Sequence, residues 1–317
     1  MKDKKILITG GTGFIGSWLA EMLYKKNKVT LFDNGRRNAL QYVSTDVRDN
    51  VELITGDIRN MNNVERVTKD QDIIFHLAAI AGASSYEKDP LLTLHVNLFG
   101  TENILKSVVN TSLQHMIIFS SSEVYGAHAH NVSEHDSTTI GPVYEGRWSY
   151  AISKLASDHV AFAYYKKHNV PITIVRPFNV YGPRQIGEGA IVNMMKTLIV
   201  ENTVYVSGDG SQKRAWCYIT DFLDAINRVL RKKAIGECFN IGNPSAYCSM
   251  SDMAALISGF SDNTSVTFMK GNTTEIQDRL PDIKKAEKEL GFRPKVGLPE
   301  GLLKSFAWYK TYAQNIG

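Results

Sequence analysis

Tyr150 and Lys154, four positions apart in the run SYAISK, could together carry out proton transfer. Residues at this spacing share one face of a helix. A tyrosine hydroxyl has an ordinary pKa of about 10 and is a poor base at neutral pH, but a nearby ammonium favours the phenolate. A phenolate could then take a proton from a hydroxyl group. Because such pairs are also common on plain helix surfaces, this one needs support from its surroundings.

The glycine-rich run TGGTGFIG at 9–16 could hold a phosphate group. Three apolar residues at 6–8 precede it, as in a buried parallel strand, and apolar residues recur at helical spacing from Ile15 to Leu23. Glycines at a strand-to-helix turn let the backbone approach a pyrophosphate at the positive end of the helix. Asp33 ends the next strand-like run, where an acid accepts hydrogen bonds from an adenosine ribose. The pattern favours a dinucleotide site over a tight turn without a ligand.

These residues must be positioned by alternating strands and helices. Strand-like runs are predicted at 6–9, 29–33, 51–55, 72–77, 116–120 and 172–175. Such alternation predicts an α/β fold with a Rossmann-type doubly wound parallel sheet and a smaller C-terminal substrate-binding lobe. The predicted dinucleotide-binding domain is 1–178, with 215–242 returning to it, and the predicted substrate lobe comprises 179–214 and 243–317. We expect the ligand in the crevice between them.

Composition excludes several classes of protein. Over 317 residues, 43% hydrophobic and 21% charged residues are ordinary for a globular protein. A net charge of +4 and a longest basic run of three residues, 231–233, give no reason to expect a nucleic-acid partner. No long apolar stretch precedes the first strand, and the three cysteines suggest neither disulfides nor a metal site. We therefore expect a cytoplasmic protein without a membrane anchor.

Two further patterns bear on partners. Long helical patterns at 91–109 and 150–168 are apolar over more than one face, so one face could pack on the sheet and the other could form a homodimer. His128, His130 and His135 are possible metal ligands by residue type. The polar residues around them indicate a mobile loop, and we predict no metal site.

Seven motifs occur in the order seen in extended short-chain dehydrogenases that act on nucleotide sugars. The chain resembles this family from about residue 4 to residue 309. The motifs are TGGTGFIG (9–16), HLAAIAG (76–82), SSSEVYG (120–126), YAISK (150–154), RPFNVYGPR (176–184), GDGSQKRAWCYITD (208–221) and DRLPDIKKAEKELGF (278–292).

The resemblance implies NAD as the cofactor, tightly retained because the reaction has no net redox change. Asp33 with Asn34 favours NAD over NADP, since a carboxylate would repel a 2′-phosphate, although Arg36 and Arg37 could reach such a group. The implied cofactor-binding residues are Gly10, Gly13, Phe14, Ile15, Gly16, Asp33, Asn34, Asp57, Ile58, Leu77, Ala78, Ala79, Tyr150, Lys154 and Pro177.

The resemblance also implies a nucleotide-diphosphate sugar as substrate, oxidised transiently at C4. Tyr150 would act as the base beside Lys154, and Ser121 would hydrogen-bond the reacting hydroxyl. The implied catalytic residues are Ser121, Glu123, Tyr150, Lys154 and Arg279. The implied substrate-binding residues are Ser122, Asn179, Arg184, Arg214 and Arg279, of which the arginines suit phosphate or carboxylate groups, although they could also be ordinary surface residues.

A 4-keto sugar can lose CO₂, eliminate water or take the hydride back on its other face. Ser122-Glu123 stands where the dehydratases carry Asp-Glu, and the triplet resembles that of UDP-glucuronate decarboxylases. Arg279 matches their arginine near C5 and the carboxylate, unless it only pairs with Asp278 or Asp282 at the start of a helix. We expect decarboxylation, with 4-epimerisation and then 4,6-dehydration as alternatives. Intact Ser121, Tyr150 and Lys154 argue against a silent NAD-binding regulator, and the nucleotide base and the sugar stay open.

Overall fold

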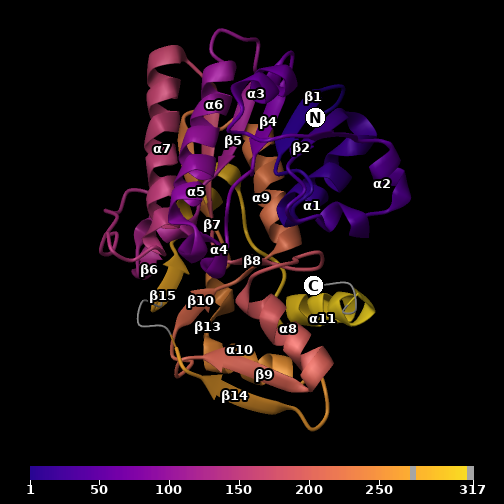
Figure 1. Ribbon diagram of the computed structural model, residues 1–317, viewed down its shortest axis with the longest axis vertical. Coiled ribbons are helices and arrows are strands. Elements are labelled where there is room, and N and C mark those ends of the chain that lie inside the picture. Colours follow the sequence, from indigo (N-terminus) through magenta and orange to yellow (C-terminus); the bar gives the residue numbers. More distant parts are fainter. Residues whose placement is uncertain (272–275, 313–317) are drawn as a thin grey trace. The chain divides into compact units, whose positions relative to one another are not determined.

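The computed structural model describes residues 1–271 and 276–312, and the chain forms two compact units (Figure 1). The first unit comprises Met1–Val124, Pro142–Arg176 and Ile226–Phe239. The second comprises Tyr125–Gly141, Pro177–Ala225 and the described residues from Asn240 onward. The segment Tyr125–Gly141 thus groups with the second unit, whereas we predicted it in the dinucleotide-binding domain. The assignment of one domain to the cofactor and one to the substrate stays a prediction.

A seven-stranded sheet forms the centre of the first unit. Its order is β12-β7-β5-β4-β1-β2-β3, and the neighbours from β7 to β3 pair in parallel. The strands are β1 (Lys5–Thr9), β2 (Lys28–Asp33), β3 (Glu52–Thr55), β4 (Ile73–His76), β5 (His115–Phe119), β7 (Ile172–Pro177) and β12 (Glu237–Ile241). The predicted Rossmann-type doubly wound sheet is confirmed. Because β2 and β4 flank β1 on opposite sides, the strand order reverses there, and ligands bind outside the carboxyl ends at such a point.

Helices cover both faces of this sheet. Figure 1 shows α3 (Met61–Thr68), α6 (Gly100–Ser107) and α7 (Trp148–His168) side by side over one face. Leu7 of β1 belongs to the buried cluster beneath them. Its neighbours Ile6 and Ile8 are also fully buried and alternate to the other face, on which α1 (Phe14–Leu23) packs. Burial on both faces explains why β1 is a continuous apolar run.

The predicted helix at 91–109 is a helical stretch with a widened turn inside it. It consists of α5 (Pro90–Leu94), a π-helix (His95–Phe99) and α6. Asp89 caps its start by accepting a hydrogen bond from the Leu92 backbone, and Pro90 occupies the first helical position. Buried Asn97 in the wide turn binds both the Ile80 backbone and the Ser153 hydroxyl. The stretch therefore connects the loop after β4 to α7.

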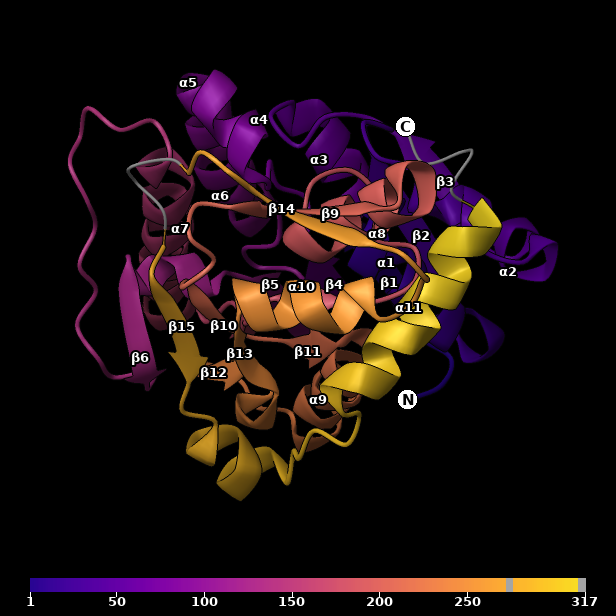
Figure 2. The same cartoon turned by 90° about the horizontal axis from the view of Figure 1, so that it is seen from below.

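The second unit is built around a four-stranded sheet in the order β13-β10-β15-β6. In Figure 2, α8 and α10 lie against the two-stranded sheet of β9 and β14 and cover part of it. The elements of the second unit are β6 (His128–Val132), β8 (Val180–Tyr181), α8 (Ala190–Glu201), β9 (Thr203–Ser207), β10 (Lys213–Ala215), β11 (Cys217–Tyr218), β13 (Tyr247–Ser249), α10 (Met250–Ser258), β14 (Ser265–Met269), β15 (Asp278–Pro281) and α11 (Leu298–Tyr312). The helix α9 (Ile219–Lys232) begins in this unit and ends in the first.

One local prediction is wrong. The segment with His128 and His130 is the edge strand β6, paired in parallel with β15, and not a mobile loop. Ala129 is buried between the two exposed histidines, which is the alternation of a strand with one covered face. Polar residues on the open face of an edge strand make its sequence look like that of a loop.

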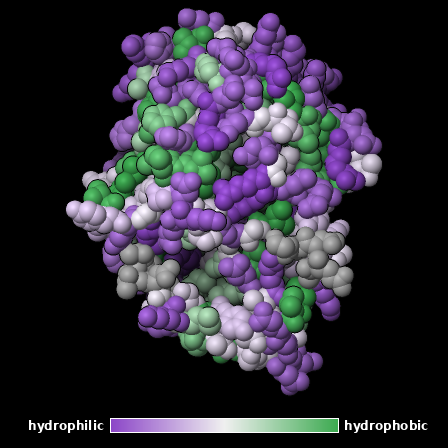
Figure 3. Space-filling model, in the orientation of Figure 1, coloured by the Kyte–Doolittle hydropathy of each residue, from purple (hydrophilic) through white to green (hydrophobic). Residues whose placement is uncertain are grey.

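The surface in Figure 3 is mostly hydrophilic, with apolar residues in small separate groups. Among the described residues, no helix has both the length and the apolar character needed to cross a membrane.

Candidate active site

The glycine turn between β1 and α1 brings backbone segments closer together than a side chain would allow. Gly10 has a left-handed backbone with φ of 71°, and a Cβ atom there would lie 2.8 Å from the Ala78 backbone nitrogen. A Cβ atom on Gly16 would collide with the Gly10 carbonyl oxygen. The helix begins at Phe14 without a side-chain cap on its first-turn N–H groups. Uncapped N–H groups at the positive end of a helix fit the pyrophosphate of a dinucleotide.

Asp33 at the end of β2 lies beside this turn. One carboxylate oxygen accepts a hydrogen bond of 3.0 Å from the Thr12 backbone, and the other accepts one of 2.9 Å from the Gly35 backbone. The side chain is therefore held at the edge where a ribose would lie. The Arg36 guanidinium donates to the Ser85 hydroxyl of α4 (Ala83–Lys88) at 2.8 Å. This contact holds Arg36 on α4, which fits a site for NAD.

The loops after β3 and β4 complete the cofactor side of the first unit. The Leu77 backbone donates to the Thr9 carbonyl at 3.0 Å, which sets Leu77, Ala78 and Ala79 against the glycine turn. Arg59 forms an ion pair with Asp57 and lowers the pKa of that carboxyl, so Asp57 is a carboxylate at neutral pH. Next to it Ile58 is buried under Gly100 of α6. Pro177 ends β7 and belongs to the second unit.

Ser121, Tyr150 and Lys154 all belong to the first unit. Lys154 is 5% exposed, and its ammonium donates to the Phe119 carbonyl at the end of β5 at 2.7 Å. This bond joins α7 to the turn that carries Ser121 two residues later. Tyr150 is half-buried, and its ring stacks on Tyr86 of α4 with 5.3 Å between the centroids. The predicted base and its lysine lie on α7, and the Lys154 bond ties that helix to the end of β5, two residues before the serine.

Glu123 lies in the 3₁₀ turn (Ser122–Tyr125) that follows Ser121. Its backbone N–H donates to the Ser121 hydroxyl at 3.1 Å, which orients the serine. Ser122 is buried, so the residue that replaces the dehydratase aspartate is packed into the protein. The Glu123 carboxylate accepts from the guanidinium of Arg147 at 3.4 Å. Sequence reasoning missed Arg147 and Tyr86, although Arg147 stands one helical turn before Tyr150.

Buried charges surround Lys154. Burial lowers its pKa to about 8, and the carboxylate of Asp158, one turn further along α7, opposes that effect. Asp158 is paired with Arg176 of β7 at 3.0 Å; burial raises its pKa and Arg176 opposes the increase. On β4, burial and the Lys154 charge lower the pKa of His76 to about 3, so this imidazole is neutral and binds Thr9. Burial therefore makes the Lys154 ammonium easier to deprotonate than that of a free lysine.

A pH profile tests this arrangement. If catalysis needs the Lys154 ammonium, activity falls as pH rises through about 8, because the lysine becomes neutral above its pKa. Asp158→Asn removes the charge that holds the proton, so we expect this alkaline limb to move about one pH unit lower. Asp158→Glu keeps the charge and should leave the limb in place. Thermal unfolding shows whether Asp158→Asn destabilises the protein by leaving Arg176 without this partner. If the folded variant keeps the alkaline limb at the wild-type pH, the prediction is wrong.

The second unit aligns two of the predicted substrate-binding arginines. Arg214 on β10 and Arg279 on β15 are paired positions in a parallel ladder, so their side chains leave the sheet on the same face. Arg279 is 1% exposed and donates to the Gly126 carbonyl at 3.0 Å. It lies on a strand and not at the start of a helix, and its pairing with Asp278 or Asp282 stays an alternative. The Asp278 carboxylate accepts from Tyr247 at 2.8 Å and lies 2.8 Å from His130.

Asn179 and Arg184 lie in the loops around β8. The Asn179 amide donates to the Ala215 carbonyl at 3.0 Å, so it links this loop to β10. Both residues have left-handed backbones, with φ of 38° and 70°. Their contact with a substrate stays a prediction.

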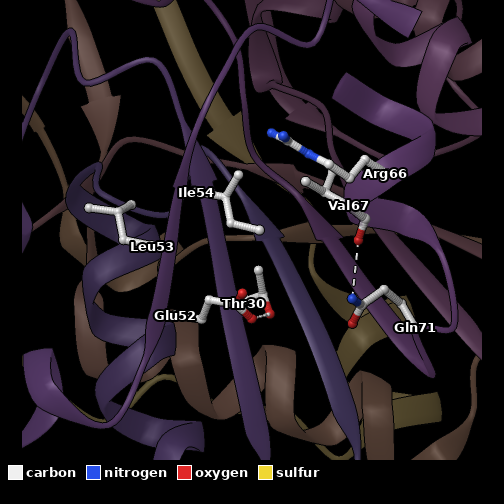
Figure 4. A pocket seen from close by; sticks show the side chains of 7 residues that line it. All are labelled: Thr30, Glu52, Leu53, Ile54, Arg66, Val67 and Gln71. Atoms are coloured by element: carbon white, nitrogen blue, oxygen red, sulfur yellow. Dashed lines mark hydrogen bonds between the residues drawn. The ribbon is translucent and has the colours of Figure 1, made fainter. Parts of the chain in front are cut away.

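Among the described residues, possible metal ligands and the pocket at β3 add nothing to the candidate site. Within residues 1–271 and 276–312, no three acidic, histidine or cysteine side chains are arranged to hold a metal ion. A pocket of about 460 Å³ opens at the edge strand β3 (Figure 4). Its polar side chains serve the fold, since Thr30 binds Glu52 at 3.1 Å and Gln71 binds the Val67 carbonyl at 3.1 Å. Its lining residues come from β2, β3, α3 and the loop after α3, and none of the predicted site residues is among them.

The uncapped glycine turn, the placed acid of β2 and the Ser-Tyr-Lys group define a dinucleotide-dependent enzyme of the short-chain dehydrogenase type. The family described as "NAD dependent epimerase/dehydratase family" matches residues 6–242, and the chain belongs to it.

Similar proteins include decarboxylases and epimerases. The chain is 33% identical to UDP-N-acetyl-alpha-D-glucosaminuronate decarboxylase of Bacillus cytotoxicus, over 97% of this chain and 98% of the relative. It is 32% identical to UDP-glucuronic acid decarboxylase 1 of Arabidopsis thaliana, over 95% of this chain and 68% of the relative. Among solved structures, the UDP-glucuronic acid 4-epimerase of Bacillus cereus in complex with UDP-glucuronic acid and NAD has a TM-score of 0.86 and 30% identity, covering 97% of this chain and 99% of that one.

Proposed function

We propose that this chain oxidises a UDP-linked uronic acid at C4 and then releases its C6 carboxylate as CO₂. The Ser121-Ser122-Glu123 turn carries the proposal, because a buried serine stands where dehydration would require a carboxylic acid. The named activities of the Bacillus cytotoxicus and Arabidopsis thaliana relatives support it. Their substrates are UDP-linked sugar acids, which is the substrate class proposed for this chain.

The residues of the first unit can perform the proton transfers. The phenolate of Tyr150 takes the proton of the C4 hydroxyl, Ser121 hydrogen-bonds that oxygen, and the Lys154 ammonium favours the phenolate. When bound, NAD⁺ accepts the hydride of C4 and returns it after decarboxylation, so the reaction has no net redox change. Gly10, Gly13, Gly16 and Asp33 are the residues that would hold it.

Carbon dioxide then leaves from the keto acid. The C6 carboxylate is β to the new C4 ketone, so breaking the C5–C6 bond releases CO₂ and moves the electron pair onto the C4 oxygen as an enolate. A proton from solvent, passed to C5 through a water molecule that the Glu123 carboxylate orients, restores the ketone. The Tyr150 hydroxyl finally returns its proton to the C4 oxygen. The position of Glu123 two residues after Ser121, whose hydroxyl accepts from the Glu123 backbone, supports this role.

The arginines of the second unit are proposed to bind the anionic parts of the substrate. Arg214 and Arg279 share one face of the sheet, which suits two negative groups close together. We assign Arg214 and Arg184 to the diphosphate, Arg279 to the carboxylate, and Ser122 and Asn179 to positioning the sugar.

The test is direct. Purified protein is incubated with UDP-glucuronate, with UDP-N-acetylglucosaminuronate and, as a control without a carboxylate, with UDP-glucose. Mass spectrometry should show loss of CO₂ from at least one of the two acids and none from the control. A 4-epimer of unchanged mass, with no CO₂, would overturn decarboxylation.

Epimerisation at C4 is the second candidate. The similarity to the Bacillus cereus UDP-glucuronic acid 4-epimerase favours it, because that enzyme acts on a sugar acid and matches nearly the whole chain. Both candidates share the substrate class and the oxidation at C4. They differ only in whether the carboxylate is lost before the hydride returns. Dehydration ranks third, because Ser122 cannot protonate a leaving hydroxyl.

Arg279→Ala separates binding of the carboxylate from oxidation at C4. We expect oxidation to continue, since the Ser-Tyr-Lys group is intact, while CO₂ release falls about 10- to 100-fold, the effect of losing a hydrogen bond to a charged group. Reduced nicotinamide should accumulate on the enzyme and be seen as an increase in its absorbance. Because Arg279 is buried on Gly126, Arg279→Lys is measured beside it, and exposed Arg293→Ala is the control. Unchanged CO₂ release in a folded variant would remove Arg279 from the mechanism.

We also propose a homodimer and a cytoplasmic location. Leu91, Phe99 and Ile152 lie exposed on the helical stretch from Pro90 to Ser107 and on α7 of the first unit. A second copy could cover these apolar side chains, and the particle mass from light scattering decides between one chain and two. Three free thiols fit a reducing compartment, which cell fractionation can check.

A further inference from the structure

An ion pair links the two segments that carry the catalytic groups. Glu123 belongs to the turn after β5, and Arg147 immediately precedes α7, one turn before Tyr150. The guanidinium of Arg147 lies 3.4 Å from the Glu123 carboxylate. The arginine side chain is 10% exposed and that of Glu123 is 23% exposed. Water screens such a pair far less than one on an open surface.

Arg147 is itself held from the other side. Its guanidinium carbon lies 5.0 Å from the centre of the Trp148 ring, in the geometry of a cation–π contact. The Trp148 indole donates to the Glu145 carboxylate at 2.7 Å, which fixes the ring. The guanidinium is therefore a placed charge and not a mobile surface group.

The pair also lies beside the proposed base. Burial raises the pKa of the Tyr86 hydroxyl, the charge of Glu123 adds to this increase, and the charge of Arg147 opposes it. Since the Tyr86 ring stacks on Tyr150, both charges are close to the Tyr150 ring.

From this geometry we propose that Arg147 is the positioning residue for Glu123. It holds the carboxylate in the orientation from which a proton reaches C5, and it fixes the Ser121-Glu123 turn against the helix of Tyr150. Arg147 itself touches neither substrate nor cofactor in this role. The inference rests on the proposed function, because that function gives Glu123 its part in the reaction.

A double-mutant cycle tests whether Arg147 acts through Glu123. The variants are Arg147→Gln, Glu123→Gln and the double variant, with Arg147→Lys as the conservative replacement and exposed Arg66→Gln on α3 as the control. We expect Arg147→Gln to lower kcat for CO₂ release about 10-fold with little change in KM. The double variant should match Glu123→Gln alone, and Arg147→Lys should restore most of the activity. Oxidation at C4 should proceed in all of them.

The outcomes separate the two proposals. If the effects multiply in the double variant, or if lysine is no better than glutamine, Arg147 has only a structural role and the inference falls. Thermal unfolding of each variant shows whether lost activity is lost folding. Absence of CO₂ with the wild type removes the proposed function and, with it, proton delivery to C5, but leaves the claim that Arg147 positions Glu123. The rate of 4-epimer formation is then measured for the same variants. If the double variant is no slower than Glu123→Gln alone, Arg147 acts through Glu123; if the two effects multiply, the inference is overturned.

Discussion

Tyr150→Phe is expected to reduce turnover at least about 1,000-fold while the protein stays folded and binds NAD. General-base catalysis contributes about 100- to 10,000-fold, and a phenylalanine at this position has no oxygen to take the proton. The ring can still stack on Tyr86, and Lys154 keeps its bond to the Phe119 carbonyl, so the surroundings of the site are preserved. The loss should therefore fall on kcat.

Two quantities are measured: the single-turnover rate of oxidation at C4, monitored by the absorbance of reduced nicotinamide, and the rate of product release. Tyr144→Phe makes the same chemical change at a side chain that is 96% exposed and should behave like the wild type. Activity of Tyr150→Phe within about tenfold of the wild type would mean that another group is the base, since a general base contributes more than that.

Gly16→Ala is expected to weaken NAD binding by about 10- to 100-fold. A Cβ atom there would collide with the Gly10 carbonyl and lie 2.8 Å from the Gly11 Cα atom, so two backbone segments would have to separate. Overpacking of this kind costs about 1–3 kcal/mol, which is up to roughly a hundredfold in affinity if the whole cost falls on cofactor binding. The expected damage is confined to the turn, because β1 and α1 are held by their own buried apolar residues.

Binding is measured by titration with NAD⁺, and folding by circular dichroism. Gly297→Ala is the control, because a Cβ atom there meets no atom within 4 Å. Affinity close to that of the wild type in Gly16→Ala would show that the turn can widen and that the close approach of these glycines is not what the cofactor needs.

Local patterns predicted the glycine turn and six of the seven strands of the sheet. Five of the six lie within about one residue of the observed strands, β7 extends two residues further, and β12 was not predicted. Most of these strands are apolar because they are buried on both faces, whereas β3 at the sheet edge is largely exposed. The edge strand β6 was mistaken for a loop, since its open face carries His128 and His130. A strand with one covered face has half as many apolar residues, and the rest look like those of a loop.

The sequence by itself determined the class of this protein: the glycine turn, the acid of β2 and the Tyr150–Lys154 pair each depend on spacing within one or two elements. Only the tertiary structure decided which charges act on them. Asp158 with Arg176 beside Lys154, Arg147 beside Glu123, and Arg279 in register with Arg214 join residues from separate elements. The strength of a charge depends on burial and on the distance between side chains, and neither is fixed until the elements pack together.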